Sequence, residues 1–593
     1  MCRPGSPTGL SSGEGTRFPA RYQHAVFAND WTYGTMWAIH LESKGASYKA
    51  TKEEFVFGKP LPLTDVVIHP QDGAMYFAVG GRKSQSGVYR VTYVGEESTA
   101  KAAPLSLDEE ARMRHAIEAS HSTAGDLGKL WGYLSHSDRH VRYAARVAIE
   151  KLPVDSWREK ALTEKQPVAA IEALIALARV SGAQSGTGLQ PVSSAGGKPK
   201  KPTTISSPGI SDVDPANVEL QNRMLAALST IQPPPGHELA SLRALQLILI
   251  RLGKPDAEVC AKIAEALDPL FPSEDPTVNR ELCQVLVAID SKQVVGKTLA
   301  AMATAKDDFQ EVATDAVLSR NDGYANAARA AAGSRPNAQQ IAYMQALRNA
   351  TAGWTPELRK TYFSWFPRAR TWKGGNSFKG FIENIRKEAL ETFAPQNELA
   401  ELDALSNKVE ATTAMANYVA PKGPGRAYTL DEATTIATTG LKAGGRNFAN
   451  GEAMYRSIMC ATCHRFNGEG GSIGPDLTGS GNRYTLRDLL ENIIDPSKVI
   501  SDQYDSHEIT KKDGSVLVGR IIVEENEKVF LMTNPFAPND HLAIAESDIA
   551  KKGTRKVSMM PPSLINALNQ DELLDLLAYL VSGGNKADKV FKN

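Results

Sequence analysis

The stretch that decides how this chain is interpreted is Cys460-Ala461-Thr462-Cys463-His464. Two cysteines three positions apart, followed at once by histidine, form a C-x-x-C-H pattern, which is typical of haem c attachment. The two thiols of such a site add across the two vinyl groups of one haem, and the adjacent histidine then lies under the iron as an axial ligand. The sequence therefore predicts one covalently bound haem on Cys460 and Cys463, with His464 on the iron.

Two other uses of paired cysteines compete with this interpretation. A zinc site would need a second Cys or His pair downstream, whereas His507 and His541 stand alone in the sequence. A thioredoxin-like dithiol would lie in a βαβ unit, but the residues before Cys460 have a short helical pattern. Five cysteines in 593 residues are too few for a disulfide framework. Cys260 and Cys283 lie on apolar helical faces, so we expect both to be buried free thiols.

The five-residue pattern alone is only moderately specific, and its flanks strengthen it. Residues 448–459 predict a short helix in which Gly451 allows another helix to approach closely. Residues 569–581 predict a second helix with the residue pattern of a capping box at its start. We expect Tyr579 and Leu580 of that helix to pack near Gly451. Two terminal helices that cross at a small residue resemble those of a small cytochrome c.

The resemblance to cytochromes c implies roles for two further residues. Pro475 follows His464 by eleven positions. A proline at that place in cytochromes c accepts a hydrogen bond from the histidine Nδ1 through its carbonyl, which fixes the ring. Met560, immediately before Pro561, would supply a thioether as the second axial ligand.

Met560 is one of several candidates for that sixth iron ligand. Met559 and Met560 are adjacent, so an extended backbone would point them in opposite directions and only one can face the iron. Pro561 favours an extended conformation at Met560, and the family resemblance places the ligand before a proline, so we choose Met560. The other candidates have neighbours that predict a strand core or an exposed polar position: Met532, His507 and His541.

Met560 follows His464 by 96 positions, a separation larger than a minimal cytochrome c needs. Much of the excess has strand patterns, and the run HEITKKDGSVLVGRIIV contains Asp513-Gly514, a strong hairpin signal. The runs EKVFLMTN and LAIAESDI add further strand-like segments. The sequence therefore predicts a small β module inserted at about 503–556.

The N-terminal part of the chain has a β pattern over residues 21–100. Short runs rich in Val, Ile and aromatic residues alternate with turn signals. This length supplies only one or two blades of a β-propeller, which needs at least about four, so either the segment packs on the next domain or the rest of a propeller is missing. Residues 1–20 are rich in Gly, Ser, Pro and Arg, and we expect a disordered start without a secretory signal peptide.

The middle of the chain is rich in Ala and Leu and predicts helices over residues 105–180 and 210–420. Around residues 134–152, the pattern resembles a HEAT-type repeat in which Asp138 and Arg142 support a turn. Aromatic residues at 354–366 are expected in the helical core. Residues 181–209 contain 16 Gly, Ser or Pro in 29 positions and predict a flexible linker. A second linker is expected at 421–430, before a cytochrome c domain at 431–585.

Composition sets the broad class. At about 150 residues per domain, 593 residues suggest a multidomain chain. Lys plus Arg and Asp plus Glu are both 67, so the balanced charge gives no reason to expect nucleic acid as a partner. No run of about 18 apolar residues occurs, so we expect no transmembrane segment. The expected fold is multidomain and mainly α.

Most of the chain closely resembles the planctomycete-type (Pirellula/Verrucomicrobium-type) haem-binding proteins. Such proteins look like a dehydrogenase-type β-propeller followed by helical repeats and a C-terminal cytochrome c. This chain departs from them at its N-terminal side, where only the tail of a propeller is present, so no catalytic pocket can be assigned to it. The segments that carry the resemblance are 30–34, 80–93, 243–257, 278–283, 353–366, 460–464, 468–479, 487–504, the GRI run of the insert at 519–521, and 560–580.

The resemblance and the haem motif together predict an electron-transfer protein. The expected donor is a dehydrogenase, and the expected acceptor is a respiratory carrier. Because haem c is attached outside the cytoplasm, we expect a periplasmic or other extracytoplasmic location, with a true start upstream of Met1. The alternative function is a helical-repeat scaffold or interaction protein whose haem is structural or sensory.

Overall fold

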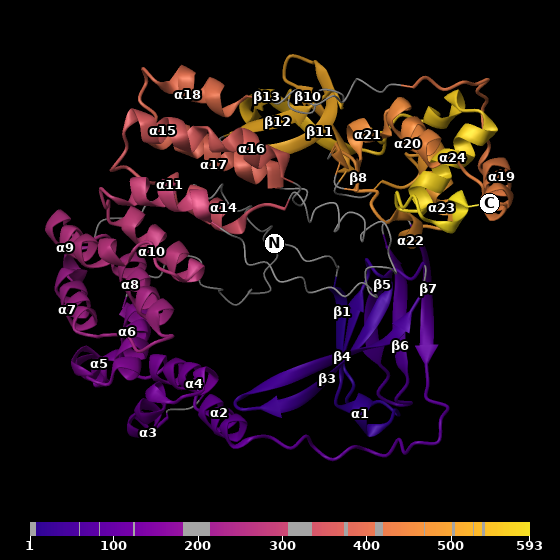
Figure 1. The fold of residues 1–593 in the computed structure, drawn as a ribbon. Coiled ribbons are helices and arrows are strands. Elements are labelled where there is room, and N and C mark those ends of the chain that lie inside the picture. Colours follow the sequence, from indigo (N-terminus) through magenta and orange to yellow (C-terminus); the bar gives the residue numbers. More distant parts are fainter. Residues whose placement is uncertain are drawn as a thin grey trace.

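The computed structural model describes residues 7–592 apart from 59, 82–83, 123–124, 182–213, 306–334, 373–377, 409–418, 468, 472, 501–503, 526 and 536–539. Figure 1 shows N-terminal strands, a long helical region, a separate sheet and a group of C-terminal helices. The chain is therefore multidomain and mainly helical. Most of the expected linker at 181–209 lies outside the described residues. Within the described part, no helix has both the length and the apolar composition needed to cross a membrane.

The N-terminal region consists of two antiparallel sheets that share one hydrophobic core. Side chains alternate between buried and half-buried along β2, as expected for strands that cover a core on one face. The first sheet has the order β1-β2-β3-β4, formed by Pro7–Ser12, Val26–Asp30, Thr35–Lys44 and Ser47–Phe57; the second has the order β5-β6-β7, formed by Leu63–Ile68, Met75–Gly81 and Ser84–Val91, and a short helix α1 spans Ala20–Gln23.

The expected disorder of residues 1–20 is wrong for the segment that forms β1. This strand pairs with β2, where Leu10 lies opposite Ala28. The Thr8 hydroxyl also donates a 2.6 Å hydrogen bond to the carbonyl of Leu63. These bonds come from residues far along the chain, so a local composition rich in Gly and Ser gives no sign of them. Residues 1–6 lie outside the described part.

The helical region packs its helices around one continuous hydrophobic core. Asp138 caps α4 by accepting a 2.7 Å hydrogen bond from the His140 amide, and Arg142 donates to the carbonyls of the preceding turn. The predicted support of this turn by Asp138 and Arg142 is confirmed. The helices are α2 (Glu109–Ala119), α3 (Leu127–Gly132), α4 (Arg139–Glu150), α5 (Arg158–Thr163), α6 (Pro167–Ser181), α7 (Val218–Ser229), α8 (Glu238–Leu252), α9 (Ala257–Leu267), α10 (Pro276–Ala288), α11 (Val294–Thr304), α14 (Ala338–Leu347), α15 (Pro356–Phe363), α16 (Trp365–Thr371), α17 (Phe378–Phe393) and α18 (Leu399–Ser406).

The aromatic run near residue 360 and the two isolated cysteines lie in this core. Tyr362, Phe363 and Phe366 are fully buried, which confirms that these aromatics are core residues. Cys260 and Cys283 are buried free thiols, also as predicted. Burial raises the pKa of the Cys283 thiol to about 12, so this group stays protonated and unreactive.

The C-terminal helices build a second core, separate from that of the helical region. α20 (Phe448–Ser457) crosses α24 (Gln570–Val581) at Gly451, where an added Cβ would lie 2.2 Å from the Asp575 carbonyl oxygen and 2.9 Å from the Tyr579 Cβ. The predicted contact between Gly451 and Tyr579 is therefore confirmed. The remaining elements are α19 (Leu430–Lys442), α21 (Cys460–Cys463), β8 (Arg465–Phe466), β9 (Glu469–Gly470), α22 (Ser480–Arg483) and α23 (Leu486–Ile494).

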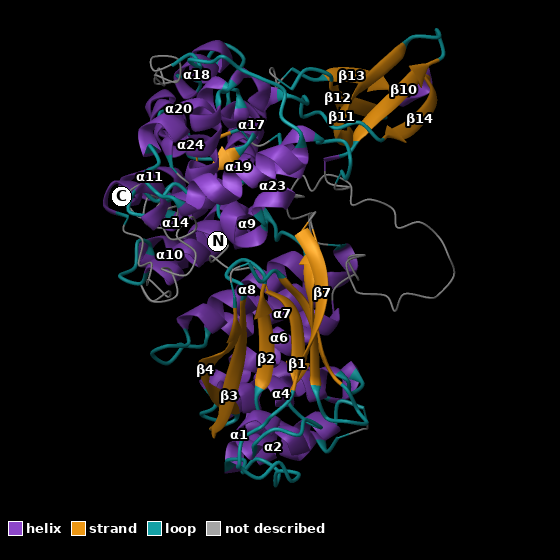
Figure 2. Cartoon of the chain, turned by 90° about the vertical axis from the view of Figure 1, so that its right-hand side faces the viewer, coloured by secondary structure: helices purple, strands orange, loops and turns teal. Residues whose placement is uncertain are grey.

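A five-stranded sheet lies between α23 and α24 in the sequence, inside the range where a β insert is expected. Its order is β13-β12-β11-β10-β14, and Figure 2 shows it projecting from the helices as a layer of its own. It has its own small core, so much of its stability is local. Its strands are β10 (Ser506–Lys511), β11 (Val516–Glu525), β12 (Lys528–Met532), β13 (Leu542–Ala545) and β14 (Ile549–Arg555).

Candidate haem site

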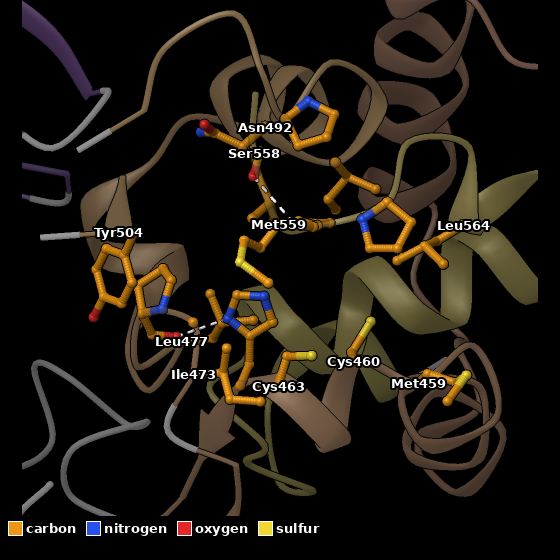
Figure 3. A pocket seen from close by; sticks show the side chains of 18 of the residues that line it. Met459, Cys460, Cys463, Ile473, Leu477, Asn492, Tyr504, Ser558, Met559 and Leu564 are labelled. Carbon is orange, nitrogen blue, oxygen red and sulfur yellow. Dashed lines mark hydrogen bonds between the residues drawn. The ribbon is translucent and has the colours of Figure 1, made fainter. Parts of the chain in front are cut away.

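The C-x-x-C-H motif is held as one short turn of helix. Met459 precedes it in the left-handed region, with φ 67°, and α21 then begins at Cys460. The His464 amide donates a 2.8 Å hydrogen bond to the Cys460 carbonyl. This turn brings the side chains of Cys460 and Cys463 to the wall of one cavity, as Figure 3 shows. The two thiols are therefore presented together to whatever fills that cavity.

Both cysteines are thiols in this structure. Burial raises the pKa of Cys460 to about 12 and also raises the pKa of Cys463. Neither side chain has an adjacent cationic partner of the kind that activates catalytic thiolates. The environment therefore suits cysteines that react once with a cofactor in their own cavity. It suits less well a dithiol that is oxidised and reduced in every catalytic cycle.

His464 is buried, with 8% of its surface exposed, and its ring is oriented by the backbone. Its Nδ1 lies 2.8 Å from the Pro475 carbonyl oxygen. Because a carbonyl oxygen can only accept, Nδ1 must carry the proton and Nε2 keeps its lone pair. Burial lowers the pKa of His464, which favours the neutral ring. A neutral imidazole with Nε2 available is the form that binds a metal ion.

Three glycines after the motif allow the following loop to wrap closely around it. A Cβ at Gly471 would lie 2.0 Å from the Thr462 carbonyl oxygen, and one at Gly474 would lie 2.5 Å from Cε1 of the His464 ring. Gly470, with φ +99°, passes equally close to the His464 carbonyl. Sequence reasoning did not assign these glycines a role, although their density directly after the motif is a usable signal.

The cavity beside the motif has a volume of about 430 Å³ and a mostly apolar lining, typical of a cofactor pocket. Both Met559 and Met560 belong to its lining, and Figure 3 shows the Met559 side chain across the cavity from the two cysteines. Their loop is fixed by a 3.1 Å hydrogen bond from the Ser558 amide to the Ser497 hydroxyl. The other candidates for the sixth ligand do not line the cavity: Met532, His507 and His541. Met532 is buried in the inserted sheet instead.

Two arginines in the cavity wall were not anticipated from the sequence. Arg483, at the end of α22, is 6% exposed, and its guanidinium carbon lies 5.4 Å from the ring of Trp31, in the turn between β2 and β3. Arg520, on β11 of the insert, donates a 2.7 Å hydrogen bond to the carbonyl of Ile473. Both contacts join segments far apart in the chain, so no local pattern announces them.

These side chains fit a covalently bound haem. The cavity offers two thiols from one helical turn, a histidine nitrogen held for metal binding, thioethers from a second loop and apolar walls. They do not fit the zinc alternative, because no group of three or more His, Cys, Asp or Glu side chains in the described part of the chain is arranged to hold an ion.

Comparison with known proteins agrees with this geometry. Residues 448–515 match the family model of cytochrome c. No curated protein matches the chain. The matched residues include the motif, the glycine loop and α23, and they end within the hairpin formed by β10 and β11. The C-terminal part of the chain therefore contains a cytochrome c domain, which implies covalently bound haem c and electron transfer to and from redox partners.

Proposed function

We propose that this protein is an electron carrier with one haem, bound to Cys460 and Cys463, with His464 and Met560 as the axial ligands. The observation that carries the proposal is that both thiols and the ring of His464 lie on the wall of one apolar cavity. The haem would supply a one-electron redox couple, and two protein ligands on the iron would leave no position for a substrate.

In this proposal the polypeptide orients the iron ligand and excludes water. Pro475 keeps the proton on Nδ1 of His464, so that Nε2 serves as the donor atom. Gly474 packs directly against the same ring, where any larger residue would displace it. The apolar lining lowers the local dielectric constant and therefore strengthens the effect of every nearby charge on the redox couple.

We further propose that electrons come from a dehydrogenase and leave to a respiratory carrier, outside the cytoplasm. The N-terminal sheets would be the C-terminal part of a β-propeller and the helical region a set of HEAT-like repeats, as in planctomycete-type haem-binding proteins. The support for this organisation is the sequence resemblance, together with two N-terminal sheets that share one core. The test of this part is direct: the purified haem protein should be reduced by a candidate dehydrogenase and reoxidised by a respiratory acceptor.

Haem attachment is tested by expressing the chain with an added secretory signal and a haem-c maturation system. We expect a protein whose mass increases by one haem and whose haem survives denaturation. The double variant Cys460→Ala/Cys463→Ala should carry none. The matched control is Cys260→Ala/Cys283→Ala, which removes the two core thiols and should keep the haem. Equal haem loading in both double variants would refute the proposed attachment.

The sixth ligand is tested by comparing the two neighbouring methionines. Met560→Ala should abolish the near-infrared band that reports sulfur ligation of ferric iron and should lower the reduction potential, with covalent haem retained. Met559→Ala should leave both nearly unchanged. The opposite pattern would assign the ligand to Met559, and a band that persists in the double variant would exclude both residues.

A further inference from the structure

The inserted sheet contributes a charged side chain directly to the cavity wall. Arg520 lies on β11, beyond the residues that match the cytochrome c family. It is half-buried, its guanidinium carbon lies 5.1 Å from the ring of Tyr504, and both residues belong to the cavity lining. The insert therefore reaches the haem site itself, although most of its strands project away from it.

A short chain of contacts links this arginine to the histidine of the motif. The Arg520 Nη1 donates to the Ile473 carbonyl at 2.7 Å. The next residue, Gly474, donates from its amide to the Cys463 carbonyl at 2.8 Å and packs against the His464 ring. Pro475 then accepts the hydrogen bond from Nδ1 of that ring. The guanidinium thus fixes the loop two residues before the carbonyl that orients the ring.

From these contacts we infer that Arg520 is a positioning residue of the haem site with a second, electrostatic effect. This inference rests on the proposed function. By holding Ile473, Arg520 steadies the loop that sets the orientation of His464. An arginine also keeps its positive charge at every accessible pH, and a positive charge in an apolar wall favours the reduced, less positive form of the iron. The insert therefore raises the reduction potential of the haem.

Three substitutions separate the two effects of Arg520. Arg520→Lys keeps the charge and a hydrogen-bond donor, Arg520→Gln keeps a donor without the charge, and Arg520→Met removes both. The matched control is Arg555→Met, on β14 of the same sheet, because Arg555 faces Glu508 and does not line the cavity. The measurements are the reduction potential from a spectroelectrochemical titration and the electron paramagnetic resonance spectrum of the ferric protein.

We expect Arg520→Met to lower the affinity of the haem for an electron about tenfold, which is about 59 mV for a one-electron couple. Its ferric spectrum should also shift, because the histidine ring loses its fixed orientation. Arg520→Gln should lower the potential with a smaller change in the spectrum. Arg520→Lys and Arg555→Met should resemble the unsubstituted protein in both measurements.

The inference is wrong if Arg520→Met keeps both the potential and the spectrum of the unsubstituted protein. It is also wrong if Arg555→Met lowers the potential as much as Arg520→Met does. Covalent haem in the unsubstituted protein is measured first, because its absence would refute the proposed function rather than the role of Arg520. If Arg520→Met does not fold, the comparison of Arg520→Gln with Arg520→Lys still decides the charge effect.

Discussion

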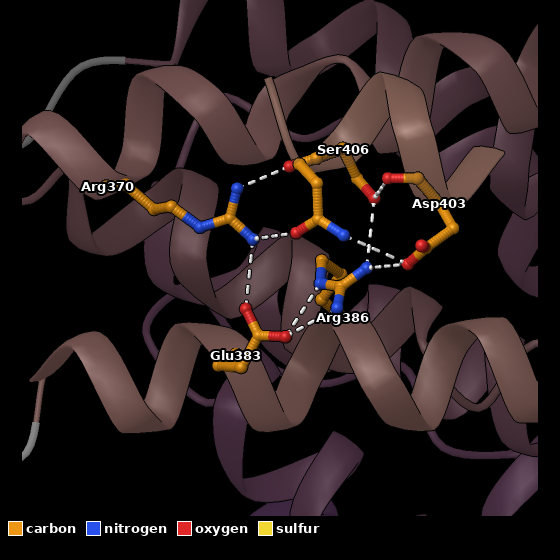
Figure 4. Close-up of polar contacts among 6 residues, drawn as sticks. Arg370, Glu383, Arg386, Asp403 and Ser406 are labelled. Carbon is orange, nitrogen blue, oxygen red and sulfur yellow. Dashed lines mark hydrogen bonds and ion pairs between the residues drawn. The ribbon is translucent and has the colours of Figure 1, made fainter. Parts of the chain in front are cut away.

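Buried polar groups behave differently in the helical region and in the haem site. Between α16, α17 and α18, Arg386 donates to Glu383 at 2.6 Å, to Asp403 at 2.5 Å and to the Ser406 hydroxyl at 3.2 Å. Arg370 approaches from the other side and donates to Glu383 at 2.9 Å and to the Ser406 carbonyl. Figure 4 shows that this cluster satisfies its own charges.

In the haem site, by contrast, the sulfur and nitrogen groups lie on the wall of a cavity. The thiols of Cys460 and Cys463 form no disulfide, and the oriented ring of His464 uses only one of its two nitrogens with the backbone. A polar cluster that satisfies itself stabilises one conformation. The two thiols and the His464 ring face a cavity instead, where they can bind a group from outside the chain. The following substitutions test that difference.

The largest effect is expected from Arg386→Met in the helical cluster. This change removes the cation that Glu383 and Asp403 share. The Arg386 side chain is only 8% exposed. Hydrogen bonds to charged groups contribute about 1.5–3 kcal/mol each, and this change removes those from Arg386 to both carboxylates. Hydrogen exchange of peptides from α16 to α18 should therefore accelerate strongly, while covalent haem attachment stays unchanged.

The matched control for that change is Lys262→Met, which removes the cation of an exposed pair with Glu258. Its effect on the free energy of unfolding should be close to zero. Similar exchange rates for both variants would mean that the buried cluster contributes no more than a surface pair.

The next largest effect on stability is expected from Gly474→Ala, which acts on the haem site and not on the helical cluster. The added Cβ would lie 2.5 Å from Cε1 and 2.8 Å from Nδ1 of His464, so the ring or the loop must move. Overpacking of this kind costs about 1–3 kcal/mol. We expect a lower thermal denaturation midpoint and a changed ferric spectrum. Gly553→Ala is the control, since a Cβ there meets no atom within 4 Å, and an equal loss in that variant would contradict the steric explanation.

Lowering the pH should destabilise the helical cluster, by less than Gly474→Ala destabilises the haem site. Burial alone would raise the pKa of Glu383, but hydrogen bonds from Arg386 and Arg370 outweigh it and hold the pKa below its ordinary value of 4.5. A carboxylate with a lowered pKa stabilises the fold above its unfolded-state pKa and loses that contribution as the pH falls through the folded-state pKa. The difference in stability between the unsubstituted protein and Glu383→Gln, measured by hydrogen exchange, should therefore be larger at pH 6 than at pH 3. A constant difference would exclude this contribution.

The smallest effect is expected from Met459→Gly, a stabilising change. Met459 has φ 67°, a left-handed conformation that costs a residue with a Cβ about 1–2 kcal/mol. Glycine removes that strain but loses more entropy on folding, about 0.5–1 kcal/mol. The net gain in the free energy of unfolding should lie between zero and about 1.5 kcal/mol. Thr462→Gly, inside α21, should instead destabilise, and a stabilising result there would show that strain at Met459 is not the cause.

The sequence predicted the parts of the site that depend on short spacing. The C-x-x-C-H motif follows from a local spacing whose chemistry is specific, whereas the role of the proline at position 475 and the helix crossing at Gly451 were implied by the resemblance to cytochromes c. The positions of Arg483 and Arg520 could not be predicted in this way, because each reaches the cavity through contacts between distant segments. The pairing of β1 was missed for the same reason, since an edge strand takes its hydrogen bonds from a neighbour and needs no apolar pattern of its own.

The crossing of α20 and α24 also has a consequence for the time at which the pocket closes. The motif is synthesised directly after α20, and the whole inserted sheet is synthesised before α24. The cavity wall needs Leu576 and Leu580 of α24. Contacts between such distant segments form late in folding, because the intervening chain must first be brought together. The cavity therefore closes only when α24 docks, and until then both thiols are open to a bulky cofactor.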